Sequence, residues 1–278
     1  MSEVTISAKD VKALRDQTGA GMMDCKKALV EAGGDFDKAI EILRKKGQKL
    51  SAKRADRDAK EGVVIAKVSN DGTRGVVVRL SCETDFVAKN DDFIGMTEEI
   101  ADLALASQPA DKDALLAKDF GGISLGDKIT EQIGVIGEKI ELADYEMLEA
   151  PLVTSYIHMG NKAGVIVGLS ANGNTVEEAG KDVAMQIAAM KPIAVDKSGV
   201  SQEVINKEIE IGMEIARKEG KPEAMLERIA TGKLNKFFKE NTLLNQAFVK
   251  NNKQSVGDYL KSVEPELTVT DFKHVALG

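Results

Sequence analysis

The sequence predicts an α+β fold that combines a small N-terminal helical domain, a duplicated core of two hairpin-plus-helix subdomains, and an inserted helical hairpin. Three patterns predict it: helical spacing of apolar residues over the first 47 residues, β-branched runs that alternate with amphipathic helices, and a long helical repeat near residues 200–240. The chain has 278 residues, more than the roughly 100–200 of a typical single domain. We therefore expect more than one folding unit.

The first 47 residues read as three short helices. Ser7 can cap the first helix, and Gly19 can end it. The second helix should run from about Asp24 to Ala32. The third should begin after Asp35 and end before Gly47, with apolar side chains repeating at helical spacing. We assign this domain to residues 1–50.

A polar stretch separates this domain from the next one. Residues 48–60 contain almost no apolar side chains, and we interpret residues 51–61 as a linker. The hydrophobic period then changes to that of a strand. The runs Val63–Val68 and Val76–Leu80 flank the turn residues Asn70–Thr73, which predicts a hairpin.

The hairpin is the first part of a pattern that occurs twice. A helix should follow it from about Asp91 to Ala106, completing a subdomain of residues 62–150. The runs Val153–His158 and Gly164–Leu169 then predict a second hairpin, and Thr175–Met190 predicts a second amphipathic helix. Residue identity between the halves is low, so the duplication is inferred from the order of elements. The second subdomain comprises residues 151–199 and 241–278.

The residues between these two segments, 200–240, predict a helical hairpin. Ser201 can cap a long helix that ends near Gly220, and Pro222 suits the first turn of a return helix. After the hairpin, we expect a short helix at Val256–Lys261 and a strand-like end. The sequence leaves open whether the hairpin self-associates.

Composition argues against several classes of function. The net charge is −7 and the pI about 5.2, whereas proteins that bind nucleic acid directly usually carry basic patches. The basic stretch Lys45–Lys60 is interleaved with acidic residues and reads as a solvated segment. Cys25 and Cys82 form no CxxC pair, and the chain has only two histidines, so we expect no metal site and no cofactor. The sequence contains no apolar run near 18 residues, as a membrane span would need, and no leader pattern of a charged stretch followed by an apolar one. We therefore expect a cytoplasmic location away from membranes.

Motifs for catalysis are also missing. Gly121–Thr130 resembles a phosphate-binding loop. Such a loop needs glycine directly followed by lysine, but here Asp127 separates Gly126 from Lys128. No clear strand precedes the segment either. Neither His158 nor His274 accompanies a recognisable serine or cysteine nucleophile. We therefore expect that the chain is not an enzyme and has no catalytic residues.

Two segments stand out as candidate binding sites. The first, TGAGMMDCKKAL, spans residues 18–29 and places Met22 and Met23 at a glycine-rich helix start. These methionines either fill the core at a tight turn or form an adaptable surface. The second, CETDFVAKN, spans residues 82–90. Here Thr84 or Asp85 can cap a helix. Phe86 either packs against the core as a hydrophobic staple or lies exposed for contact with a partner protein.

The segments TGAGMMDCKKAL and TDFVAKN, about 55 residues apart, resemble the two signature segments of the elongation factor Ts family. The resemblance covers nearly the whole chain. It implies a three-helix domain similar to ubiquitin-associated (UBA-like) domains, a duplicated core, and a coiled-coil hairpin inserted within the second subdomain. It also implies a non-enzymatic guanine nucleotide exchange factor that releases GDP from elongation factor Tu during translation.

The resemblance also implies residue roles. The segment Thr84, Asp85, Phe86 and Val87 would enter the GTPase near its Mg²⁺ site and displace the ion. Further contacts with elongation factor Tu in its GDP-bound form are implied at Met22, Met23, Lys26, Ile136, Gly137 and His158.

The chain departs from the family pattern at a few positions. Arg79 stands where the family often has an acidic residue, and Ser81 replaces a common asparagine. Longer family members continue into a C-terminal helix that clasps the partner, and the sequence shows no equivalent. Two other functions stay open: an adaptor that binds without accelerating GDP release, and a hydrolase that uses aspartate or glutamate.

Overall fold

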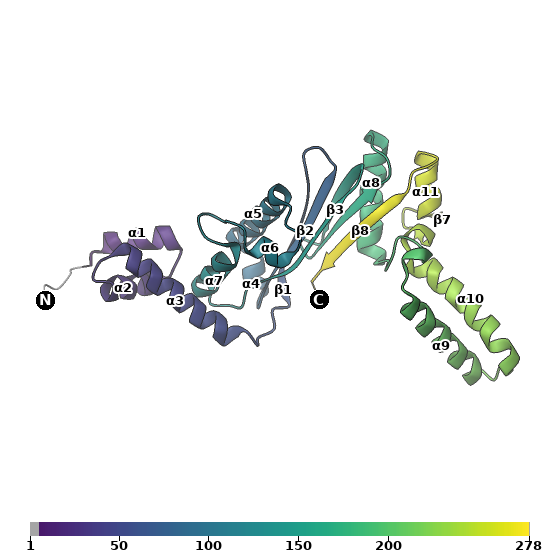
Figure 1. Ribbon diagram of the computed structural model, residues 1–278, viewed down its shortest axis with the longest axis horizontal. Coiled ribbons are helices and arrows are strands. Elements are labelled where there is room, and N and C mark those ends of the chain that lie inside the picture. The colour runs from purple at the N-terminus through teal and green to yellow at the C-terminus, as the bar shows by residue number, and fades with distance from the viewer. Residues whose placement is uncertain (1–5, 278) are drawn as a thin grey trace. The chain divides into compact units, whose positions relative to one another are not determined.

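Helices and small sheets are combined in the computed structural model, which describes residues 6–277 (Figure 1). One three-stranded sheet has the order β1-β2-β3 and another the order β4-β5-β8, so the predicted α+β class is confirmed. The chain forms two compact units. The first comprises the described residues up to Val64 together with Val78–Tyr145 and Leu277, and the second comprises Ile65–Val77 and Glu146–Ala276.

Three helices open the chain: α1 (Ala8–Thr18), α2 (Met22–Glu31) and α3 (Phe36–Arg54). Ser7 and Asp10 form a reciprocal capping box at the start of α1, and Gly19 ends it with a φ of 69°. The interior is aliphatic and contains one thiol. It consists of Val11, Leu14, Ala20, Cys25, Ala28, Leu29 and Ala39.

The predicted end of α3 at Gly47 is wrong, because the helix continues to Arg54. Gly47 keeps an ordinary helical conformation and allows α3 to pass close to α7 (Leu125–Ile136). A Cβ at Gly47 would lie 2.9 Å from the carbonyl oxygen of Thr130. The glycine therefore serves close helix packing instead of terminating the helix. Of the expected linker 51–61, residues 51–54 belong to α3, and Glu61 begins β1.

The predicted first hairpin and its helix are present as β1 (Glu61–Val68), β2 (Arg74–Cys82) and α5 (Asp91–Ser107). Between them lies the single-turn helix α4 (Asp85–Ala88). Sequence reasoning missed α6 (Lys112–Leu116), α7 and β3 (Glu141–Glu149). The stretch that resembles a phosphate loop contains the start of α7.

That start is an ordinary helix cap. The hydroxyl oxygen of Ser124 accepts the Asp127 amide proton at 3.1 Å and donates to the Asp127 carboxylate at 2.7 Å. Since the Asp127 carboxylate is hydrogen-bonded to the Ser124 cap, the role of both residues is to start α7, and no phosphate-binding role is needed to explain them.

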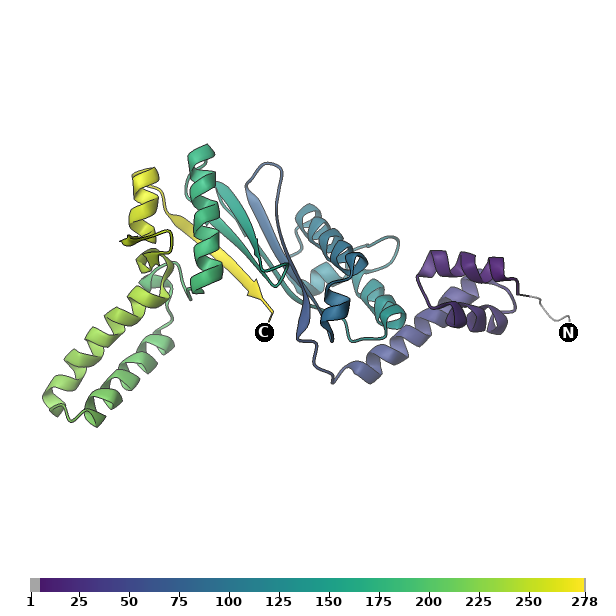
Figure 2. The same ribbon diagram turned by 180° about the vertical axis from the view of Figure 1, so that it is seen from behind.

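In the second unit, β4 (Leu152–His158), β5 (Ala163–Leu169) and β8 (Val269–Ala276) form an antiparallel sheet. The helix α8 (Asn174–Met190) packs against β4 and β5 (Figure 2). The core between them includes Val165, Val167, Leu169, Val176, Val183 and Ile187. A short hairpin, β6 (Ala247–Phe248) and β7 (Asn251–Ser255), precedes α11 (Val256–Val263). The predicted hairpin, both helices and the final strand are confirmed, whereas β6 and β7 were missed.

The helical hairpin consists of α9 (Gln202–Lys218) and α10 (Glu223–Asn241). They pack closely because Gly212 faces Ala230, and a Cβ at Gly212 would lie 3.1 Å from the Ala230 Cα atom. At the base of the hairpin, the entering and leaving segments are hydrogen-bonded. The Ile193 amide donates to the Asn241 carbonyl at 2.9 Å, and the Leu243 amide donates to the Ala194 carbonyl at 2.9 Å.

Two short 3₁₀ turns, η1 (Lys197–Gly199) and η2 (Leu243–Asn245), flank the hairpin. Over residues 6–277, none of the helices combines the length and apolar character that crossing a bilayer requires.

Candidate functional site

Thr84–Val87, which we call the TDFV segment, lies where β2 passes into α4. Thr84 caps α4 in extended conformation, and its hydroxyl accepts the Val87 amide proton at 3.5 Å. The Phe86 side chain is 83% exposed. The alternative in which Phe86 staples the loop to the core is therefore wrong, and the ring is presented to solvent. Burying such a ring is favourable, which makes Phe86 a candidate for contact with another protein.

Asp85 places a carboxylate beside this ring in the sequence. Its side chain is about half exposed at 48%, and its Oδ2 accepts a hydrogen bond from Lys89 Nζ at 2.6 Å. This ion pair raises the pKa of Lys89, through the hydrogen bond first and the charge of Asp85 second. The carboxylate thus lies half exposed and paired with Lys89, one residue before the exposed ring.

A groove of about 700 Å³ begins at this segment. Its lining includes Phe86 and Val87 from the TDFV segment, Met96 from α5, Phe120, and Ile136 from the end of α7. Gly137, the next residue, ends α7 with a φ of 83°. The structure therefore brings Ile136 to the same groove as Phe86, although the two are distant in the sequence. Charged and polar side chains, among them Asp91, Glu99 and Lys128, lie between these apolar ones, so the groove is mixed in character.

Two carboxylates that sequence reasoning missed hold the base of the segment. Glu138 Oε2 accepts the amide protons of Glu83 and Thr84, both at 3.0 Å, and Glu138 Oε1 accepts the Thr84 hydroxyl proton at 2.6 Å. Nothing in the spacing of Glu138 distinguishes it from other surface glutamates.

Glu83 is bound in turn by groups from two other segments. Its Oε1 accepts the Lys139 amide proton at 2.6 Å and pairs with Arg54 at 2.7 Å, and its Oε2 pairs with Arg57 at 2.9 Å. Partial burial opposes ionisation of Glu83. The Lys139 amide and the Arg57 and Arg54 guanidinium groups overcome it and lower the pKa to about 2.

The neighbouring thiol is buried. The Cys82 S–H donates to the Thr84 carbonyl oxygen at 3.2 Å. Burial, followed by the charge of Glu138, raises the pKa of Cys82 to about 12. This cysteine therefore has a packing role and does not offer a reactive thiolate.

The other predicted segment lies on α2. Met22 and Met23 are 48% and 62% exposed, so of the two alternatives the structure favours an adaptable surface over core filling, and Lys26 is exposed as well. Cys25, Ala28 and Leu29 supply the buried face of this helix instead. The methionines thus form an adaptable apolar surface next to a cation.

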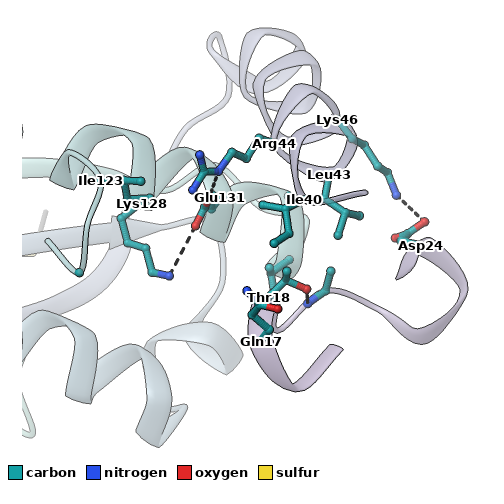
Figure 3. Close-up of a pocket in the computed structure, with 14 residues that line it drawn as sticks. Gln17, Thr18, Asp24, Ile40, Leu43, Arg44, Lys46, Ile123, Lys128 and Glu131 are labelled. Carbon is teal, nitrogen blue, oxygen red and sulfur yellow. Dashed lines mark hydrogen bonds and ion pairs between the residues drawn. The ribbon is translucent and has the colours of Figure 1, made fainter. Parts of the chain in front are cut away.

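A second hollow, of about 290 Å³, lies between the N-terminal helices and α7 (Figure 3). Its charged groups are paired. Arg44 Nε and Lys128 Nζ contact Glu131 at 2.6 and 3.5 Å, and Lys46 contacts Asp24 at 2.6 Å. Because its cations are already paired with carboxylates, this hollow is better explained as a gap between packed helices than as an anion-binding site.

His158 lies in the second unit, at the end of β4. Its Nδ1 lies 3.1 Å from the Tyr156 hydroxyl oxygen, and the neighbouring Ile157 and Met159 are 37% and 71% exposed. The histidine is therefore held in place within an exposed apolar strand end.

A metal site was not expected from the sequence. Within residues 6–277, no group of three or more His, Cys, Asp or Glu side chains is arranged to hold a metal ion.

Comparison with known proteins identifies the family. A family model described as elongation factor TS matches residues 83–278. The elongation factor Ts of Christiangramia forsetii is 59% identical over 273 residues, which are 98% of this chain and 99% of the relative. That of Flavobacterium psychrophilum is 56% identical over 274 residues, covering 99% of both chains. The chain belongs to the elongation factor Ts family. The resemblance based on the two signature segments is thereby confirmed.

Within the elongation factor Ts family match lie the TDFV segment, Ile136, Gly137 and His158. The α2 surface with Met22, Met23 and Lys26 precedes the matched residues but is covered by the alignments with the full-length relatives. Arg79 and Ser81, the two departures noted above, serve the fold. Arg79 forms an ion pair with Asp144, and Ser81 is buried.

Proposed function

We propose that this chain is a guanine nucleotide exchange factor that accelerates GDP release from elongation factor Tu during translation elongation. The observation that carries the proposal is the 83% exposure of Phe86 on a single-turn helix whose base is firmly held. An aromatic ring in this position can enter the packing of a partner. A member of the elongation factor Ts family has elongation factor Tu as the expected partner.

The proposed mechanism has a steric part and an electrostatic part. Phe86 would wedge into the partner near its nucleotide site, and Asp85 would compete with the GDP phosphates for the partner's Mg²⁺ ion. Mg²⁺ neutralises phosphate charge and holds the nucleotide, so its displacement weakens GDP binding. Thr84 and Val87 complete the segment by capping α4 and lining the groove.

The required energy is compatible with this arrangement. A thousandfold acceleration of release corresponds to a barrier lowered by about 4 kcal/mol. An exposed ion pair contributes about 0–1 kcal/mol, which is too little. Burying a phenylalanine ring contributes about 1.5–3 kcal/mol, and weakening Mg²⁺ coordination adds to this. Coupling between two binding equilibria is reciprocal. GDP must therefore weaken the affinity of elongation factor Tu for this chain by the same factor by which this chain weakens its affinity for GDP.

Additional contacts would extend the interface. We assign this role to Met22, Met23 and Lys26 on α2, to Ile136 and Gly137 at the end of α7, and to His158 on β4. The interaction takes place in the cytoplasm, uses the GDP-bound partner, and requires no cofactor, nucleic acid or chemical catalysis by this chain. Self-association through α9 and α10 stays a prediction.

The decisive experiment measures release of a fluorescent GDP analogue from purified elongation factor Tu, with and without this chain. We expect faster release in proportion to added chain until saturation, and we expect added Mg²⁺ to oppose it. Binding without faster release would favour the adaptor function. Release that is insensitive to Mg²⁺ would leave only the steric part of the mechanism.

A further inference from the structure

We infer that Glu138 and Glu83 form a carboxylate clamp that holds the TDFV segment in its exposed conformation and ties it to the last turn of α3. Glu138 and Glu83 are positioning residues, since neither needs to touch the partner. The inference rests on the proposed function for its effect on exchange. The clamp itself, however, is a property of the free chain and can be tested there.

The bonding within the clamp is reciprocal. The backbone amide of Glu83 donates to the Glu138 side chain at 3.0 Å, while the backbone amide of Lys139 donates to the Glu83 side chain at 2.6 Å. Two segments more than 50 residues apart in the chain are thus joined by a pair of crossed bonds. Each acceptor is a carboxylate, and bonds to ionised acceptors are stronger than neutral ones.

The clamp fixes the residue at which the segment leaves the sheet. Glu138 receives three bonds from Glu83 and Thr84, and one of them comes from the hydroxyl that caps α4. The side chain at position 138 therefore sets the direction in which α4 starts. The Phe86 ring lies two residues beyond that point and is 83% exposed.

The third component of the clamp is the end of α3. Arg54, in the final turn of α3, pairs with Glu83 while its side chain is only 19% exposed. Lys139 Nζ donates to the carbonyl oxygens of Ala55 and Arg57, both at 3.0 Å. Because α3 also packs in the N-terminal helical core, the same helix that carries that core is bonded to the base of the TDFV segment.

The expected functional consequence is specific. Without the clamp, the segment samples conformations that cannot dock, so only a fraction of molecules is competent. The apparent dissociation constant rises by the inverse of that fraction, whereas the rate within the docked complex stays the same. Loss of the clamp should therefore raise the concentration needed for half-maximal exchange and leave the plateau rate unchanged.

The first test uses the free chain and a spectroscopic readout. Since the sequence has no tryptophan, F86W creates a unique fluorophore at the tip of the segment. We expect the tryptophan anisotropy of F86W to fall when Glu138→Ala is added, and to fall less with Glu138→Gln, which keeps one acceptor oxygen. Glu146→Ala, at an exposed carboxylate on β3, is the matched control and should leave the anisotropy unchanged. Unchanged anisotropy in a folded F86W/E138A chain would overturn the clamp.

The second test measures GDP release at increasing concentrations of the chain with Phe86 intact. For Glu138→Ala we expect the half-maximal concentration to rise about tenfold, with the same plateau, and for Arg54→Ala a smaller rise. A lowered plateau with an unchanged half-maximal concentration would refute the positioning role. If the unmodified chain fails to accelerate release, the proposed function fails, but the anisotropy measurement still decides whether the clamp exists.

Discussion

Phe86→Ala removes the side chain on which the proposed wedge depends. The ring is 83% exposed, so its removal takes little apolar surface out of the folded core. Substitutions at such surface positions change the free energy of unfolding by no more than about 0.5 kcal/mol. If the ring is buried in elongation factor Tu during exchange, its removal costs about 1.5–3 kcal/mol of stabilisation in that complex.

This energy translates into a rate. At about 1.4 kcal/mol per factor of ten, we expect GDP release promoted by Phe86→Ala to be slower by a factor of about 10 to 150. The assay is stopped-flow release of fluorescent GDP, with thermal unfolding measured in parallel. Val249→Ala, which removes another exposed apolar side chain (48% exposed), is the control and should exchange normally. Full exchange activity in Phe86→Ala would refute the wedge.

Three further perturbations address other features of the structure. Gly47→Ala should lower the free energy of unfolding by about 1–3 kcal/mol, because a Cβ there would lie 2.9 Å from a backbone oxygen. Gly232→Ala, in open space, is the control and should raise the free energy of unfolding by up to about 1 kcal/mol. Denaturant unfolding measures both, and equal effects would contradict the packing role of Gly47. The pKa of Glu83 falls from 4.5 to about 2 on folding, so its stabilisation is complete above about pH 4.5 and is lost as the pH falls through 2. Glu83→Gln should therefore flatten the acid-side loss of stability by no more than about 2 kcal/mol, and an unaltered acid profile would count against the ion pairs. Cys25 and Cys82 are both buried, so a chromogenic thiol reagent should react only on unfolding, and rapid reaction of the native chain would contradict this.

Local signals in the sequence predicted most of the elements correctly. Ser7, Asp35 and Ser201 cap helices as their side chains indicated, and the two β-branched hairpins lie where the period changes. These features depend on neighbouring residues, so a single sequence contains them. The end of α3 was misplaced because Gly47 acts through a distant helix, which no local pattern reveals.

The candidate site was predicted only in part for the same reason. The TDFV segment was found by resemblance, but the sequence could not decide whether Phe86 faces the core or the solvent. The residues that hold the segment, Glu83 and Glu138, bond across more than 50 positions in the chain. Carboxylates of this kind look like any other surface charge until the fold brings their donors together.

The paired ends of the helical hairpin limit how this module could be shortened. Ala194 and Thr242 bridge each other directly, so the hairpin begins and ends at one point of its unit. This bridge is parallel, so the chain must cross over between the two residues, and a short turn could not replace the hairpin while keeping the bond from the Leu243 amide to the Ala194 carbonyl. A shortened variant should therefore remove matched turns from α9 and α10 next to Gly220 and keep the helical residues at the base, which return the chain to this bridge.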